Sequence, residues 1–247
     1  MKKGTGSSQS FNVVEAEGDD LIHSDGKTAQ KAIELLHKYK EMEKPFFLAV
    51  GFVRPHVPLV APKKYFDAYP LAEIVLPPKI PGDQNDIPQN PANRRTTDNY
   101  KMDLNQQKGT LRAYYASVSF VDALVGKILG ALETTGQRDN TIVIFTSDHG
   151  YHLGEHDLWQ KVSIHEESAR VPLIICVPGK KTAVCHSLSE LIDLYPTVSQ
   201  LCGLKIPGNV QGKDISIMFD DPTVKVRDAA LSSGKGRLLR TEKWALL

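Results

Sequence analysis

The chain has 247 residues, enough for one large domain or one and a half ordinary ones, and its 41% apolar and 24% charged residues are typical of a globular protein. Its 30 basic and 29 acidic residues nearly balance, which argues against the basic surface that nucleic-acid binding requires. No apolar run approaches the length that spans a bilayer, and no apolar segment follows the basic start. The sequence as it stands therefore predicts neither a transmembrane segment nor a signal peptide.

The first half of the chain predicts a helix, a strand and a long loop. Residues 1–20 are rich in glycine and serine and then acidic, which predicts an irregular lead-in. Residues 27–40 carry apolar side chains at helical spacing, and the apolar residues 46–52 predict a buried strand. Nine prolines between residues 54 and 95 predict a long loop without secondary structure of its own, a kind of segment that is usually functional or mobile.

The second half alternates between helices and strands. Residues 107–134 follow the helical period up to Gly136, and residues 190–203 predict a second helix that ends at a glycine. Apolar runs at 141–146 and 171–177 predict strands, and residues 238–247 predict another strand. This order indicates an α/β fold whose central sheet is largely parallel and covered by helices on both faces.

Asp148 and His149 directly follow the predicted strand 141–146 and are the first candidate site residues. Ligands in α/β proteins bind at the carboxyl ends of strands. A carboxylate suits a hard metal ion, and an imidazole adds a nitrogen ligand or a hydrogen bond to an anion. The alternative is structural: Asp148 caps the following turn and His149 fills a polar pocket. For the dipeptide alone, the structural interpretation is the commoner one.

Lys161 and His56 are the other candidates. A lysine ammonium is a compact charge that suits a tetrahedral oxyanion, although an isolated lysine is usually a surface residue. The prolines on both sides of His56 would hold its imidazole in a fixed orientation, as a proton donor to a leaving group requires. The alternative is a loop histidine that only packs. Four histidines lie within the loop that carries Lys161. A weaker interpretation is that they form an adventitious zinc site. They are His149, His152, His156 and His165.

Several segments, taken in their order and spacing, closely resemble the type I sulfatases of the alkaline-phosphatase-like superfamily. The resemblance is nearest to the iduronate-2-sulfatase-like branch, in which the metal pair is Asp-His. It extends from about residue 31 to the end of the chain. The segments are Phe46-Phe-Leu-Ala-Val-Gly-Phe-Val-Arg-Pro-His-Val-Pro58, Tyr114-Tyr-Ala-Ser-Val-Ser-Phe-Val-Asp-Ala-Leu-Val-Gly126, Phe145-Thr-Ser-Asp-His-Gly150, Leu153-Gly-Glu-His156, Lys161 and Val171-Pro-Leu-Ile-Ile175.

The resemblance implies hydrolysis of a sulfate ester at a calcium site. By similarity, Asp148 and His149 match the later metal-site pair, Lys161 matches the lysine that contacts the sulfate, and His56 matches the histidine near the leaving-group oxygen. The implied substrate is a sulfated small molecule or a sulfated carbohydrate. Family members are commonly exported, but the sequence does not reveal the compartment of this chain.

The chain departs from the family in its nucleophile and in half of its metal site. The family's nucleophile is a cysteine in a Cys-x-Pro-Ser-Arg segment, oxidised to formylglycine, and the sequence contains no such segment. Its cysteines lie in other settings, and no apolar strand precedes the aspartate pair at 19–20 as the early metal ligands of the family require. The three cysteines are Cys176, Cys185 and Cys202.

We therefore expect a partial sulfatase that is inactive by itself. The expected parts are the lead-in 1–20, a partial catalytic domain over 21–230, incomplete at its N-terminus, and the start of a truncated C-terminal subdomain over 231–247. One alternative is a phosphoesterase or phosphonate hydrolase of the same superfamily, with magnesium or a transition metal and a serine or threonine nucleophile. Another is a non-catalytic remnant that binds a metal or an anion.

Overall fold

The computed structural model describes residues 11–42, 44–83, 85, 100–161, 163–234 and 236–246. They form two compact units. Unit 1 takes its residues from Met1–Lys79, Thr96–Thr141 and Leu153–Leu158, and unit 2 from Ile80–Arg95, Ile142–His152 and Trp159–Leu247. The domain boundaries expected from the sequence stay a prediction.

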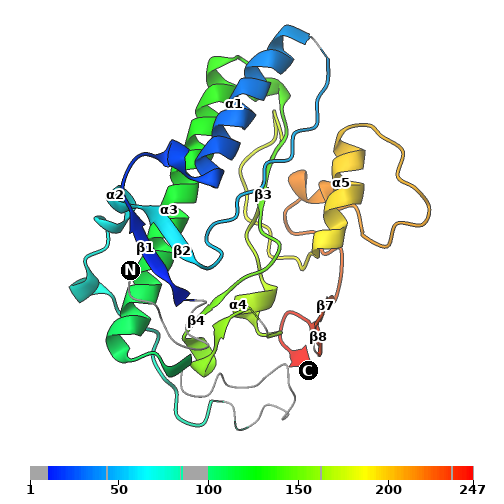
Figure 1. Ribbon diagram of the computed structural model, residues 1–247. Coiled ribbons are helices and arrows are strands. Elements are labelled where there is room, and N and C mark those ends of the chain that lie inside the picture. The colour runs from blue at the N-terminus through cyan, green and yellow to red at the C-terminus, as the bar shows by residue number, and fades with distance from the viewer. Residues whose placement is uncertain are drawn as a thin grey trace. The chain divides into compact units, whose positions relative to one another are not determined.

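Two long helices of unit 1 lie side by side, as Figure 1 shows: α1 (Ser24–Met42) and α3 (Leu104–Thr134). The side chain of Asp103 accepts a hydrogen bond from the Gln106 N–H, and the Gln106 side chain accepts one from the Asp103 N–H. This capping box begins α3, and Gly136, with φ +70°, follows its end. Both helices predicted from the apolar spacing are confirmed.

The core of unit 1 forms between α3 and a small parallel sheet. Strand β1 (Val13–Ala16) pairs with β2 (Leu59–Pro62), which leads directly into α2 (Lys63–Phe66). Buried side chains from these elements pack together: Ala29, Leu59, Ala61, Phe66, Ala113, Ala116, Phe120 and Leu124. The irregular lead-in expected over residues 1–20 is thus corrected at β1, because Val13 and Val14 pair with β2. Residues 1–10 of that prediction lie outside the described residues.

Two predictions for residues 46–95 are wrong. Residues 46–52 form no strand, although side-chain exposure still alternates along them, because no other described strand pairs with them. The proline-rich loop contains β2, α2 and the 3₁₀ helix η3 (Leu71–Glu73). Pro62 and Pro70 stand at the N-caps of α2 and η3, where a missing N–H costs little. Residues 84 and 86–95 of the predicted loop lie outside the described part of the chain.

Unit 2 contains the strand that leads to the candidate site. Strand β3 (Val143–Thr146) pairs antiparallel with β6 (Leu173–Cys176), and the one-turn helix α4 (Glu166–Ala169) precedes β6. The helix α5 (Leu194–Leu201) continues from η8 (Leu191–Asp193) and is followed by Gly203 with φ +67°. Both strands and the helix are confirmed as elements.

The largely parallel sheet is not confirmed. Only β1 and β2 run parallel among the described pairs, whereas β3 and β6 run antiparallel. An apolar run reveals a buried strand but not its direction, so sequence pattern alone could not settle this point.

The end of the described chain is an antiparallel sheet of three strands instead of the single strand predicted over residues 238–247. It consists of β7 (Ala230–Ser233), β8 (Arg237–Arg240) and β9 (Ala245–Leu246). A turn between Thr241 and Trp244 separates β8 from β9, with the Thr241 N–H donating to the Trp244 carbonyl at 2.8 Å. The remaining short elements are η2 (Asp20–Ile22), η6 (Arg138–Asn140), β4 (His152–Leu153), η7 (Glu155–Asp157), β5 (Trp159–Gln160) and η9 (Ser216–Phe219).

Among the described helices, α3 alone meets the length and composition of a membrane-spanning segment. Core helices of globular proteins meet the same test. Ala113, Ala116 and Phe120 of α3 are buried in the core of unit 1. We therefore interpret α3 as the core helix of that unit.

Candidate functional site

Asp148 and His149 lie directly beyond the end of β3 in unit 2. The Asp148 side chain is 86% exposed and that of His149 35% exposed. The His149 backbone N–H donates to Asp148 Oδ1 at 3.0 Å, and His149 Nε2 lies 3.5 Å from Asp148 Oδ2. The strand end therefore presents a carboxylate oxygen and a ring nitrogen close enough for one cation to contact both.

The position of the proton on His149 follows from its neighbour. Its Nδ1 lies 2.8 Å from the carbonyl oxygen of Gly150, which can only accept, so Nδ1 carries the proton in the neutral ring. The lone pair is then on Nε2, the atom beside the Asp148 carboxylate. Histidines that bind metals commonly have this arrangement, with the second ring nitrogen bonded to a backbone carbonyl.

Gly150 is itself fixed against α4. Its N–H donates to the Ser168 carbonyl at 2.9 Å. A Cβ at this position would lie 2.0 Å from the Glu167 carbonyl oxygen and 3.0 Å from that of Arg170. Only glycine permits this close approach, so the backbone of α4 positions the carbonyl that sets the His149 tautomer. The sequence shows a glycine here, but not that a helix backbone lies against it.

Asp148 and His149 fit a divalent cation as part of a coordination shell. A calcium ion takes six to eight ligands, mostly oxygens, and this pair supplies one carboxylate and one imidazole. Within the part of the chain that the structure describes, no group of three or more His, Cys, Asp or Glu side chains could hold a metal ion. The pair accounts for some of a metal's ligands and leaves the others unassigned.

Lys161 lies in unit 2 directly after β5 and is partly buried. Two residues further on, Ser163 Oγ lies 2.6 Å from His152 Nε2 and accepts a hydrogen bond from the His165 backbone N–H at 3.2 Å. His152 is 1% exposed, and its ring centroid lies 5.8 Å from that of His165. Two of the four clustered histidines thus support the segment that carries Lys161.

His56 lies in unit 1 with an exposed side chain. Its Nδ1 lies 2.6 Å from the Val57 carbonyl oxygen, so Nδ1 carries a proton and Nε2 is the position that exchanges one with a ligand. The peptide bonds that precede Pro55 and Pro58 are both cis. Asp148, His149 and Lys161 belong to unit 2, so the meeting of all four residues at one site stays a prediction.

The sequence did not point to Asp25. Its carboxylate binds the backbone at the start of residues 53–58, which we call the His56 segment. Its two oxygens accept the backbone N–H groups of Val53 and Arg54. These partners lie 28 and 29 residues away along the chain. The only local signal was an acidic residue in the first turn of a helix, which is common.

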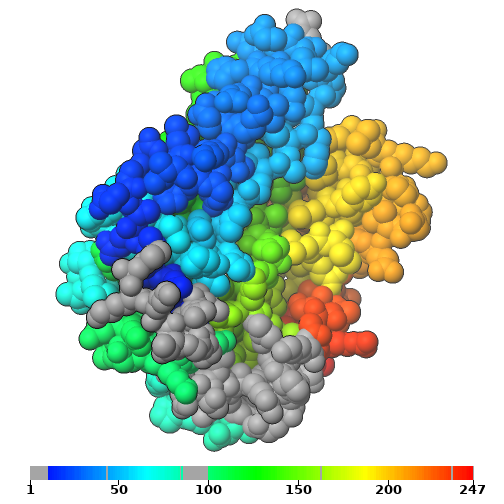
Figure 2. Space-filling view, viewed as in Figure 1, coloured from blue at the N-terminus to red at the C-terminus, as the bar shows by residue number. Residues whose placement is uncertain are grey.

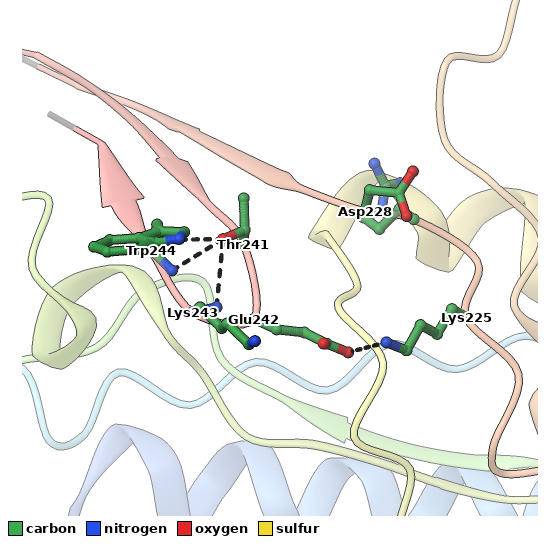
Figure 3. A pocket seen from close by; sticks show the side chains of 7 residues that line it. Lys225, Asp228, Thr241, Glu242, Lys243 and Trp244 are labelled. Atoms are coloured by element: carbon green, nitrogen blue, oxygen red, sulfur yellow. Dashed lines mark hydrogen bonds and ion pairs between the residues drawn. The ribbon is translucent and has the colours of Figure 1, made fainter.

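One open cavity of about 210 Å³ in unit 2 contains none of the four candidates (Figure 3). Trp244, 70% exposed, and Thr241 lie on one side of the view, and Lys225 pairs with Glu242 at 2.5 Å. Arg227, which also lines the cavity, pairs with Glu190 at 2.6 Å and with Asp193. Because these charges are paired within unit 2, we do not assign the cavity to the candidate site.

Known sequences resemble this chain over most of its length. The family profile described as Sulfatase matches residues 8–204. A protein named sulfatase from Formosa agariphila is 38% identical over 212 residues, which are 81% of this chain and 40% of the relative. Human iduronate 2-sulfatase is 33% identical over 222 residues, which are 74% of this chain and 40% of the relative. The chain thus spans less than half the length of these relatives.

Solved structures resemble its fold. Phosphonate monoester hydrolase from Silicibacter pomeroyi superposes with a TM-score of 0.78 at 23% identity, covering 93% of this chain and 50% of the hydrolase. At that identity the superposition establishes a shared α/β fold, and the chemistry has to be argued from the site residues.

Proposed function

Because the chain belongs to the type I sulfatase family, we propose that it provides the residues that bind the metal, the sulfate group and the leaving-group oxygen in a sulfuric ester hydrolase. The observation that carries this proposal is the pair at the end of β3. There, the Gly150 carbonyl holds the proton of His149 on Nδ1 and leaves Nε2 beside the Asp148 carboxylate.

In this proposal Asp148 and His149 hold a calcium ion. When bound, the ion would neutralise sulfate charge and orient the nucleophile. The exposure of Asp148 leaves its oxygens accessible to a cation, and the carboxylate contacts its chain neighbours Ser147 and His149.

Lys161 binds the sulfate group. Its ammonium offers three donors and a full charge to a tetrahedral anion, whose oxygens accept from any direction. The hydrogen bond between Ser163 and His152 limits the movement of the backbone near Lys161 and so reduces the entropy lost on binding.

His56 protonates the leaving oxygen. As the S–O bond of the ester breaks, negative charge develops on the departing oxygen, and the imidazolium donates its Nε2 proton there. The hydrogen bond to the Val57 carbonyl occupies Nδ1, so Nε2 alone transfers the proton.

The attacking group is not among these residues. The sequence contains no Cys-x-Pro-Ser-Arg segment from which formylglycine could form. Cys176 and Cys185 are partly buried, Cys202 is exposed, and none lies beside the β3 pair in sequence. We propose that the 247 residues alone bind a sulfate ester without hydrolysing it.

The proposed substrate is a sulfated small molecule or a sulfated carbohydrate. The relatives support this class, since one of them is named iduronate 2-sulfatase. A phosphonate hydrolase is the second candidate, favoured by the fold that the chain shares with phosphonate monoester hydrolase from Silicibacter pomeroyi. A non-catalytic remnant that binds a metal or an anion is the third.

Titration calorimetry of the 247-residue chain tests the proposal, with sodium sulfate and methylphosphonate as probes in the presence of calcium. We expect sulfate to bind more tightly than methylphosphonate, and Lys161→Ala to weaken sulfate binding at least tenfold. Lys180→Ala is the matched control, because Lys180 is a lysine of the same unit that pairs with Asp220. Equal sulfate affinity of the Lys161→Ala and Lys180→Ala variants would overturn the proposal, and tighter methylphosphonate binding would favour the second candidate.

A kinetic assay separates an enzyme from a binding protein. The purified chain, supplied with calcium, is incubated with 4-nitrophenyl sulfate, and release of nitrophenol is followed by absorbance. We expect no turnover above the uncatalysed rate. Calcium-dependent turnover that is lost in a His56→Ala variant would show instead that the chain supplies its own nucleophile.

A further inference from the structure

Asp25 is a buried carboxylate that binds the backbone of the His56 segment. It is the second residue of α1 and is 2% exposed. Its Oδ1 accepts the Val53 N–H at 3.1 Å, and its Oδ2 accepts the Arg54 N–H at 2.8 Å. A buried carboxylate is costly without such partners, and here each oxygen has one.

The first turn of α1 is itself held in place. A Cβ on Gly26 would lie 1.8 Å from the carbonyl oxygen of Asp20, so this turn packs directly against the backbone of η2. The carboxylate of Asp25 therefore projects from a fixed position in unit 1. Both carboxylate oxygens accept a hydrogen bond. Asp25 therefore restrains the direction of the backbone at residues 53 and 54 as well as the distance of this backbone from α1.

The Arg54 side chain connects the start of the His56 segment to its end. Its Nη1 donates to the carbonyl oxygens of His56 at 2.5 Å and of Pro58 at 2.7 Å. Burial lowers the pKa of Arg54, and the charge of the nearby Asp25 carboxylate opposes that shift. Asp25 thus binds the first residues of the segment, and the Arg54 side chain links them to Pro58 at its end.

His56 stands at the centre of these bonds with its ring in solvent. Its N–H donates to the Val53 carbonyl at 2.9 Å, and its Nδ1 contacts the Val57 carbonyl at 2.6 Å. In Figure 2 the chain between α1 and β2, coloured light blue to cyan, is visible at the surface. The imidazole of a histidine that only packed would be buried. Here the hydrogen bonds restrain the backbone, and the imidazole stays exposed.

We propose that Asp25 and Arg54 are positioning residues that fix the His56 imidazole in the orientation its proton transfer requires. This inference rests on the proposed function of His56. Proton transfer to a leaving oxygen requires the donor within hydrogen-bonding distance and aligned, so disorder in the segment would slow it. Asp25 and Arg54 act through His56 and need not touch the substrate.

Nuclear magnetic resonance of the 247-residue chain tests the inference without requiring turnover. In Asp25→Asn, one carboxylate oxygen becomes an amide donor and can no longer accept an N–H. We expect hydrogen exchange of the Val53 or the Arg54 amide, whichever loses its acceptor, to accelerate at least tenfold. We also expect the neutral His56 ring to lose its Nδ1–H tautomer, seen in its ring nitrogen shifts, because the Val57 carbonyl is no longer held in place.

Asp103→Asn is the matched control. Asp103 is also an aspartate at the start of a helix of unit 1, where it accepts the Gln106 N–H at 2.8 Å. Asparagine still accepts that bond through its amide oxygen, so the variant removes a charge at a helix start and should leave both α3 and the His56 ring signals unchanged. Asp25→Asn signals of His56 and exchange rates of both the Val53 and Arg54 amides that match the wild type would overturn the inference.

Arg54→Lys provides a second variant in case Asp25→Asn does not fold. A lysine keeps the charge but lacks the planar guanidinium, and we expect intermediate mobility at His56. Wild-type ring signals in Arg54→Lys would exclude a positioning role for Arg54. Sulfate binding at Lys161 separates this inference from the proposed function. Asp25→Asn and Arg54→Lys should both still bind sulfate. Failure of the wild type to bind sulfate would reject the proposed function without changing what the resonance data show about the His56 segment.

Discussion

The imidazole of His149 donates its Nδ1 proton to the carbonyl oxygen of Gly150, 2.8 Å away, and so presents an Nε2 lone pair beside Asp148. That carbonyl is in place because Gly150 packs on the backbone of α4. A helix of one turn thereby determines which nitrogen of a strand-end histidine can bind a cation. The candidate metal site depends on backbone packing as well as on its two ligands.

Replacing Gly150 by alanine should disrupt this packing. The added Cβ would lie 2.0 Å from the Glu167 carbonyl oxygen, so α4 or the end of β3 must move. We expect a loss of about 3 kcal/mol in the free energy of unfolding, measured by urea denaturation. Gly130→Ala in α3 is the control, since its added Cβ would meet no atom within 4 Å outside the backbone of its own helix, and alanine favours helices over glycine by about 1 kcal/mol. Similar stability of the two variants would contradict the packing argument.

Removing the Ser163 hydroxyl should loosen the segment that carries Lys161. His152 Nε2 lies 2.6 Å from that hydroxyl in a buried setting, and Ser163→Ala removes this hydrogen bond. We expect a destabilisation of about 1–3 kcal/mol and weaker sulfate binding with Lys161 still present. Ser187→Ala, at a partly buried serine of the same unit that accepts a backbone N–H from Val226, is the comparison. Sulfate affinity equal to that of the wild type would show that the Ser163 bond does not support Lys161.

Acid should destabilise unit 1 through Asp20. Burial alone would raise the pKa of Asp20, but hydrogen bonds from Lys127, Lys64 and Tyr65 lower it below its ordinary value. A depressed pKa in the folded state gives stability that is present above the unfolded pKa, about 3.9, and is lost as the pH falls through the folded value. Unfolding free energy should therefore fall with decreasing pH in this range.

The Asp20→Asn variant tests the assignment, because it removes the titrating group. Its unfolding free energy should depend less on pH below about pH 4 than that of the wild type. Asp139→Asn, at an exposed position of the same unit, should retain the wild-type slope. Parallel pH profiles for wild type and Asp20→Asn would show that other carboxylates cause the acid sensitivity.

The helices of this fold could be predicted from the sequence, and the strand pairing could not. The spacing of apolar residues revealed α1, α3 and α5, because each buries one face. The continuous apolar run at 46–52 predicts a buried strand, but strand formation also needs a partner, which is information from elsewhere in the chain. The direction of β6 against β3 is likewise set by the connection between them, whose path the sequence pattern does not reveal.

The candidate residues could be chosen from the sequence, whereas their supports could not. Asp148, His149 and His56 stood out because they follow an apolar run or lie between prolines, and Lys161 through the resemblance to the sulfatases. The supports depend on distant contacts: Asp25 binds residues 28 and 29 positions away, and Gly150 contacts the backbone of α4. Such contacts leave only weak local signals, an acidic first helical turn and a glycine.

The central claim is that the end of β3 binds a divalent cation, and a calcium titration followed at the ring nitrogens of His149 tests it most directly. We predict a saturable shift of the Nε2 resonance, with Nδ1 remaining protonated, and at least tenfold weaker calcium binding in Asp148→Asn. The exposed Asp220→Asn of the same unit should bind calcium as the wild type does. An Nε2 resonance that does not respond to calcium, or responds equally in Asp148→Asn, would contradict the account.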